Sequence, residues 1–398
     1  MTNIYTLTST LHDPKSVEAA TSEFLQSLNI DYALKGSDFS DYGQADLNLI
    51  YVRTGGTEGI FKPLLPSLME QSRQPVYLLT SGKSNSLAAS MEILSYLRQQ
   101  GIKGEILHGD AAYIRQRIAL LQQVESARKR LQGRRLGIIG QPSDWLISSE
   151  ADNEAVLQRL GITLVDVPMS EVISLYPSQQ PTADAELMSK APTEGIRASL
   201  PGTLKIYQAL REITLKYRLD GLTIRCFDLL TAVHNTGCIA LAKLNSEGII
   251  AGCEGDVPAM LSMTISKAIT GVSGFQANPA RINPETGELL FAHCTIPFNM
   301  VEHYELDTHF ESGIGVGIRG YMKGGPVTIF KVSGHVDRHF AEEAQLVRNQ
   351  GKADLCRTQQ VIRLDDASAA RYFLTDPIGN HHIIMPGHWK AVIDALME

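Results

Sequence analysis

The chain has 398 residues, of which 43% are hydrophobic and 20% are charged, and its net charge is −7. This length predicts two or three domains rather than a single core, and the negative charge balance argues against a nucleic-acid-binding surface. The N-terminal MTNIYTLTST lacks the pattern of a signal peptide, and no charge-free run of 18 apolar residues occurs. We therefore expect a cytoplasmic protein without a membrane span.

Short β-branched runs alternate with helical periods in the first two-thirds of the chain, a pattern that predicts βαβ units with parallel sheets. One helical period is SLAASMEILSYLRQQG, in which Leu87, Met91, Leu94 and Leu97 mark the apolar face and Gly101 suits the C-cap. The predicted strands are Asn3–Ser9, Asp46–Val52, Pro75–Thr80, Arg135–Gly140, Thr163–Val167, Gly221–Cys226 and Gly248–Cys253.

The pattern changes after about residue 270, where TGVSGFQANPARINPETGE is rich in turn residues. It leads into the short predicted strands LLFAHC, GVGIRGY, PVTIFKVSG and QQVIRL, which indicate a small barrel or sandwich. The predicted fold class is α/β, with two Rossmann-like parallel-sheet domains followed by a C-terminal β-barrel-like domain. A charged link near ARKRLQGRRLG suggests the boundaries 1–133, 134–270 and 271–398.

Ligands of open parallel sheets bind beyond the carboxyl ends of the strands, so the loops at those ends hold the candidate substrate-binding residues. In RTGGTEG, Glu58 is able to bind hydroxyl groups, although a plain glycine turn is equally expected. In SGKSNS, we expect Ser84, Asn85 or Ser86 to cap a helix.

Two further loops after predicted strands carry polar and aromatic candidates. QPSDWLISS offers Asp144 and Trp145 to a sugar, and the alternative for Trp145 is packing in the core. RCFDLL offers Arg225 and Asp228, which also suit an ion pair with each other.

A carboxylate pair ends the apolar strand Gly248–Cys253. Asp256 suits the N-cap of the helix that Pro258 opens. Glu254 has no such explanation, and an acidic side chain at the end of a strand suits a divalent cation with oxygen ligands. His293, in FAHCTIP, and His381 and His382, in GNHHIIMPG, flank predicted strands of the β-rich segment. They are either core histidines or members of a Glu/His metal centre.

These segments resemble the L-fucose isomerase/L-arabinose isomerase-like sugar isomerases, and the chain is similar to a short member of that group. The resemblance runs from about residue 85 to 388 and rests on NSLAASMEIL, GQPSDWLISS, RCFDLL, TGCIALAKLN, GCEGDVPAMLSM, AHCTIP and GNHHIIMPG.

The resemblance implies two α/β domains and a β domain, assembled as a homo-trimer or homo-hexamer with active sites near subunit contacts. It also implies a divalent metal, most often Mn²⁺, that binds an open-chain sugar. Glu254 matches the acidic residue that is both metal ligand and acid/base, and His381 and His293 match ligand histidines. His382 is the less favoured histidine of its pair, with a substrate-binding role.

One position departs from the family pattern. Many members of that family have an aspartate where the segment GFQANPARI places Asn278. An amide oxygen is able to bind a metal but does not take a proton at neutral pH. We therefore expect Asn278 in the metal and catalytic site, and either another carboxylate serves as the second acid/base or metal binding is weakened.

The function that this resemblance implies is metal-dependent aldose–ketose isomerisation of a free, non-phosphorylated monosaccharide through a cis-enediol intermediate. The chain has no phosphate-binding loop of the Walker type. The alternatives are a non-catalytic sugar-binding protein, which Asn278 suits, and a metal-dependent lyase or aldolase. The five cysteines, at positions 226, 238, 253, 294 and 356, show no CxxC spacing and are expected to be buried free thiols.

Overall fold

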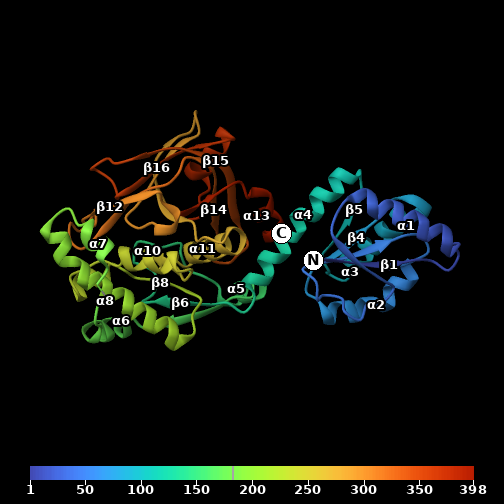
Figure 1. Ribbon diagram of the computed structural model, residues 1–398, viewed down its shortest axis with the longest axis horizontal. Coiled ribbons are helices and arrows are strands. Elements are labelled where there is room, and N and C mark those ends of the chain that lie inside the picture. Colours follow the sequence, from blue (N-terminus) through green and yellow to red (C-terminus); the bar gives the residue numbers. More distant parts are fainter. Residues whose placement is uncertain (182) are drawn as a thin grey trace. The chain divides into compact units, whose positions relative to one another are not determined.

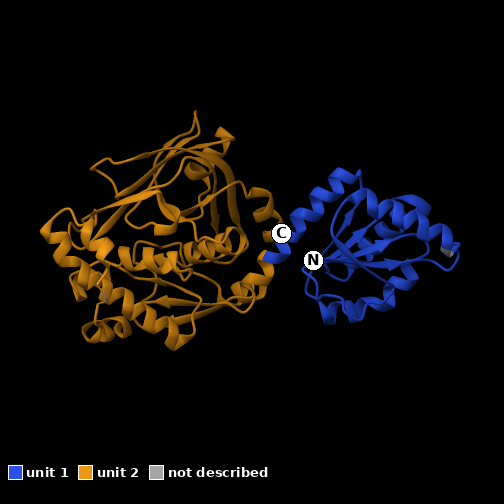
Figure 2. Ribbon diagram, viewed as in Figure 1, with its two compact units in different colours: residues 1–126 blue, residues 127–398 orange. Residues whose placement is uncertain are grey.

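The computed structural model describes residues 1–181 and 183–398. The chain forms two compact units, residues 1–126 and residues 127–398, which Figure 2 shows in different colours. Within the described ranges, no helix is long and apolar enough to cross a lipid bilayer. The predicted division into domains 1–133, 134–270 and 271–398 stays a prediction.

The first unit is built on a parallel sheet with the strand order β2-β1-β3-β4-β5. Neighbouring side chains of β1 point to opposite faces, so Tyr5 packs against α2 and α3 while Ile4 packs against α1 and α4. This burial on both faces explains why the central strands are apolar throughout. The elements are β1 (Thr2–Leu7), α1 (Pro14–Leu28), β2 (Tyr32–Gly36), β3 (Leu47–Val52), α2 (Glu58–Gln71), β4 (Val76–Leu79), α3 (Ser86–Gln99), β5 (Gly104–Leu107) and α4 (Ala111–Leu131).

Helix α3 forms where the sequence predicts it, but the predicted buried face is wrong. Met91 is 61% exposed, and of the four predicted positions only Leu97 is fully buried. The buried face instead carries the small residues Ala89 and Ser90 beside Ile93. Small side chains let the helix lie close to the sheet, so the larger ones are left at its sides.

The second unit contains another parallel sheet, with the order β7-β6-β8-β9, and a closed antiparallel barrel, β10-β11-β16-β15-β14-β17. Both sheets and the barrel confirm the predicted fold class. The sheet region contains β6 (Arg135–Ile139), α5 (Asn153–Leu160), β7 (Thr163–Val167), α6 (Met169–Leu175), α7 (Ala185–Ser189), α8 (Glu194–Tyr217), β8 (Gly221–Ile224), α9 (Asp228–Ala232), α10 (Cys238–Ser246), β9 (Ile250–Cys253) and α11 (Val257–Thr270).

The barrel region adds a two-stranded sheet of β12 and β13 and two short helices. Its elements are β10 (Phe275–Asn283), β11 (Glu288–His293), β12 (His303–Asp307), β13 (Gly317–Tyr321), β14 (Gly325–Val332), β15 (His339–Gln350), β16 (Thr358–Leu364), α12 (Tyr372–Thr375), β17 (His382–Pro386) and α13 (Lys390–Met397). Strand β10 lies in the segment that the sequence predicts as turns. Its Pro279 adjoins a register shift in the pairing with β11, the kind of position where a strand tolerates proline.

Helix α11 joins the sheet to the barrel. It contacts β8 and β9 on one side and β14 and β17 on the other, and Figure 1 shows it between the two layers. Nearly all of its side chains are buried for this reason. The end of β9, immediately before α11, therefore faces the barrel strands that carry the predicted histidines.

Candidate metal centre

Glu254 lies in a tight turn between β9 and α11. Its backbone φ is +64° and that of Gly255 is +72°, a region that non-glycine residues seldom adopt. The backbone N–H of Ser143 donates to the Glu254 carbonyl at 2.9 Å. A Cβ atom at Gly255 would lie 2.2 Å from the carbonyl oxygen of Gln141, so only glycine fits here. The turn thus places the Glu254 carboxylate, 8% exposed, between sheet and barrel.

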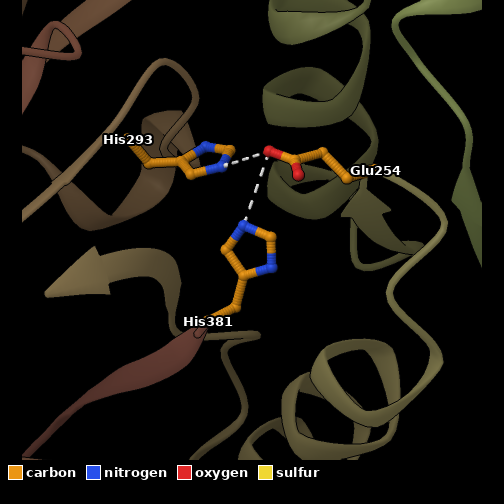
Figure 3. Close-up of side chains that lie close together, drawn as sticks. All are labelled: Glu254, His293 and His381. Atoms are coloured by element: carbon orange, nitrogen blue, oxygen red, sulfur yellow. Dashed lines mark ion pairs between the residues drawn. The ribbon is translucent and has the colours of Figure 1, made fainter. Parts of the chain in front are cut away.

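Two imidazoles point at one oxygen of this carboxylate, as Figure 3 shows. His293 ends β11 and its Nε2 lies 3.6 Å from Glu254 Oε1. His381 immediately precedes β17 and its Nε2 lies 3.5 Å from the same atom. The three residues are buried, and their ligand atoms all lie within 4.8 Å of one another. The structure therefore brings together three of the four predicted ligands.

The donor atoms fit a divalent cation. Buried polar atoms normally have a hydrogen-bond partner, yet within the described residues His381 Nε2 has none, although it faces Glu254. Asn278 Oδ1, which belongs to a residue lining the same pocket, also has none. Two histidines and a carboxylate that leave positions open form the donor set of a catalytic metal site.

His381 is oriented by a second carboxylate. Its Nδ1 lies 2.8 Å from Asp256 Oδ2, and Asp256 Oδ1 accepts the backbone N–H of Ala259 and so caps α11. The predicted cap is confirmed. A carboxylate behind a ligand histidine fixes which ring nitrogen faces the metal.

Lys331 of β14 adds a further buried charge beside Asp256, and it was not predicted from the sequence. Its Nζ lies 3.3 Å from both oxygens of Asp256. Burial acts to raise the pKa of Asp256, but Lys331 and His381 outweigh it and hold that pKa at about 2. The available signal was a lysine inside the apolar run PVTIFKVSG.

The histidine and glutamate pKa values follow from the same contacts. Burial acts to raise the pKa of Glu254, but His381 and His293 hold it well below its usual range. Burial acts to lower the pKa of His381, but Glu254 and Asp256 raise it to about 9. Burial lowers the pKa of His293, which favours the neutral ring that binds metals.

An aromatic wall stands beside the carboxylate. Trp145 Nε1 donates to Glu254 Oε2 at 2.7 Å, and its ring meets Phe227 edge-on at 4.8 Å. Phe227 in turn meets the His309 ring at 5.5 Å. Burial lowers the pKa of His309 to about 4. The sequence predicted Trp145 but neither Phe227, although it lies in the motif RCFDLL, nor His309, which lies in no such motif.

The pocket at this centre is lined by both sheet and barrel residues: Cys226, Phe227, Leu230, Thr236, Gly237, Cys238, Cys253, Glu254, Asn278, His293, Cys294, His309, Glu311 and Cys356.

The remaining predicted residues have other neighbours. Arg225 donates to Asp144 at 2.8 Å and to Asp228 at 3.1 Å, so the ion-pair alternative is confirmed. His382 is completely buried, with Nε2 3.0 Å from the Tyr372 hydroxyl and Nδ1 3.1 Å from the Asn380 carbonyl, and it does not line the pocket.

In the first unit, two predicted loop residues lie at helix starts. Glu58 begins α2. Asn85 holds the N-cap position of α3, but its side chain makes no capping hydrogen bond in the described structure.

Comparison with known proteins finds relatives that all have the same name, sulfoquinovose isomerase. The chain is similar to the sulfoquinovose isomerase of Alkalicoccus urumqiensis, with 24% identity over 282 residues, which cover 68% of this chain and 62% of the relative. It is also similar to the sulfoquinovose isomerase of Priestia megaterium, with 25% identity over 228 residues, 54% of this chain and 51% of the relative. The protein of the same name from a Clostridium species is 24% identical over 277 residues, 67% of this chain and 60% of the relative.

The chain thus spans between about half and three-fifths of the length of these relatives. No protein-family model matches it.

Proposed function

We propose that this chain is a metal-dependent aldose–ketose isomerase that acts on a free, non-phosphorylated monosaccharide through a cis-enediol. The observation that carries the proposal is the buried cluster of Glu254, His293 and His381, with Glu254 and His293 lining a pocket. The similarity to proteins named sulfoquinovose isomerase supports a sugar as the substrate class.

The resident metal in this proposal is Mn²⁺, held by Glu254, His293 and His381 with Asn278 as a further oxygen donor. Such an ion, when bound, supplies a Lewis acid that favours negative charge on the oxygens at C1 and C2 of the sugar. The unpartnered Oδ1 of Asn278 among the described residues supports its part in the site.

The side chains of the protein would move the proton and hold the sugar. Isomerisation removes a proton from C2 and returns one to C1, and Glu254 is the base in this proposal, a role worth roughly 10²–10⁴-fold in rate. Trp145 holds one oxygen of that carboxylate by its indole N–H. The aromatic wall of Trp145, Phe227 and His309 offers a sugar ring or chain an apolar face. Glu58, Asp144, Arg225 and Asp228 stay predictions as substrate-binding residues.

The assembly also stays a prediction. We propose a homo-trimer or homo-hexamer with active sites near the subunit contacts, which sedimentation velocity of the purified protein would test.

Asn278 favours a second candidate function. An amide in place of a carboxylate suits a site that binds a sugar without turning it over. A sugar-binding protein needs no metal, whereas the isomerase needs about one ion per site.

The experiment is metal analysis followed by a product screen. The protein is stripped with a chelator, refilled with Mn²⁺ and incubated with sulfoquinovose and with neutral aldoses, and the products are separated by chromatography. About one ion per chain and metal-dependent ketose formation are expected. Cleavage products would instead support a lyase. Sugar binding without metal or product would support the second candidate. Glu70→Gln, at an exposed position of α2, is the control variant, and any activity that it loses during stripping and refilling measures the damage done by the procedure itself.

A further inference from the structure

The five cysteines of the chain all line one pocket, the pocket of the candidate metal centre. They are far apart in the sequence and come from both the sheet region and the barrel region. Two of them adjoin candidate ligands, since Cys253 precedes Glu254 and Cys294 follows His293. All five are free thiols in the described structure, and only Cys356 is more than marginally exposed.

Cys226 and Cys253 are close enough to react with each other. Their Sγ atoms lie 3.2 Å apart, and a disulfide requires about 2.05 Å, so closure needs a movement of about 1 Å. The backbone brings them together. Cys253 ends β9 and pairs in register with Ile224, the last residue of the neighbouring strand β8, and Cys226 follows Ile224 by two residues. Both side chains belong to the pocket wall, so a small oxidant that enters the pocket reaches them.

We propose that Cys226 and Cys253 form a reversible disulfide that disables the metal centre. The effect on the centre rests on the proposed function, whereas the formation of the bond does not. One sulfur attacks an oxygen of hydrogen peroxide, which gives a sulfenic acid and releases one water. The second sulfur then displaces the sulfenic oxygen, and a second water leaves. Two thiols and one peroxide thus give one disulfide and two waters, and an external dithiol reverses the change.

The bond disturbs the centre because Cys253 is covalently attached to Glu254. Metal–ligand distances hold within about 0.2 Å, a much smaller margin than the movement that closure needs. The turn at Glu254 has little freedom to absorb the shift, since the Ser143 N–H and the packing of Gly255 against Gln141 fix it.

The test is peroxide treatment of the Mn²⁺-loaded protein followed by non-reducing peptide mapping, thiol titration and metal analysis. We expect free thiols to fall from five to three, a peptide that links Cys226 to Cys253, and a loss of bound Mn²⁺ of about tenfold or more. Dithiothreitol restores both the thiols and the metal binding.

Matched variants separate this pair from Cys294 and Cys356, two further thiols that line the same pocket. Cys226→Ser, or Cys226→Ala if the first does not fold, should keep its Mn²⁺ under peroxide, while Cys356→Ser should lose it as the parent does. Three results would overturn the proposal: a disulfide between Cys294 and Cys356 in place of the expected one, a count of free thiols that peroxide does not change, or a Cys226–Cys253 disulfide that leaves metal binding intact. The mapping is independent of sugar turnover, so failure of the isomerase proposal would be recognised separately.

Discussion

The Lys331 ammonium lies 3.3 Å from both oxygens of Asp256, and the two side chains are 1% and 0% exposed. Removing one partner of a buried ion pair leaves an uncompensated charge and typically costs about 3–5 kcal/mol. We therefore expect Lys331→Met to lower the free energy of unfolding by about that amount, measured by urea denaturation.

The double variant Lys331→Met with Asp256→Asn is the control. Asparagine keeps an acceptor for the Ala259 N–H but carries no charge, so the double variant should be more stable than Lys331→Met alone. Equal stability of the two would show that the charge of Asp256 is not what Lys331 compensates.

Glu254→Gln should abolish metal-dependent turnover while the protein stays folded. The amide has nearly the same shape and keeps an acceptor for Trp145, but it does not take a proton. A loss of roughly 10²–10⁴-fold in kcat is expected for a missing general base, and loss of the ligand adds to it. Initial rates and circular dichroism are the measurements, and retained turnover would remove Glu254 from the mechanism.

Asn278→Asp should tighten metal binding. It places a second carboxylate in the pocket that Glu254 and His293 line, at a position where an oxygen has no partner among the described residues. We expect Mn²⁺ affinity to rise by about tenfold or more, since ligand charge is a main determinant of affinity for hard cations. Metal titration by calorimetry measures this. The metal-free variant should melt at a lower temperature than the parent, and unchanged affinity would place Asn278 outside the ligand set.

Trp145→Phe should keep the aromatic contact with Phe227 but remove the indole N–H that Glu254 accepts. A hydrogen bond to a charged group contributes about 1.5–3 kcal/mol. We expect kcat/KM to fall by at least about tenfold while Mn²⁺ content is kept. A loss of metal instead of turnover would mean that Trp145 only supports the ligand.

His309 should make stability fall with acidification. Burial lowers its folded pKa to about 4, below the ordinary value of 6.5, so between these pH values the unfolded chain binds more protons. Stability contributed by neutral His309 is therefore full above pH 6.5 and is lost as pH falls toward 4, by up to about 3 kcal/mol. Urea denaturation of the metal-free protein and of His309→Gln at pH 6.5 and 4.5 measures it. The variant should lose less stability between the two pH values than the parent.

Strands whose side chains are buried on both faces could be predicted from the sequence. Strand β3 is such a strand and differs from its prediction by one residue. The half-buried edge strand Thr163–Val167 also has the predicted bounds, because TLVDV is rich in β-branched residues. The edge strand Tyr32–Gly36 was missed because its half-buried side chains form no apolar run. Strand β15 was missed as well, since HFAEEAQLVRNQ consists largely of residues that favour helices.

Some residues of the candidate site could likewise be predicted from the local sequence, and others could not. Glu254 could be predicted because a charge at the end of an apolar strand needs a partner, and His293 and His381 because they flank strands. Lys331 and His309 join the site only through tertiary packing, which brings β14 and the segment before β13 to the end of β9. The sequence around these two residues contains no pattern that predicts this packing.

The turn Glu254-Gly255-Asp256 has a consequence for mutational tolerance. In a selection for activity, all three positions should reject nearly every substitution, as if they served one purpose. The causes differ: Glu254 is needed for its chemistry, Gly255 because the Gln141 carbonyl leaves no space for a side chain, and Asp256 because it caps α11 and orients His381. Scoring the same library for expression would separate them, since substitutions at Glu254 alone should yield protein that folds normally and does nothing.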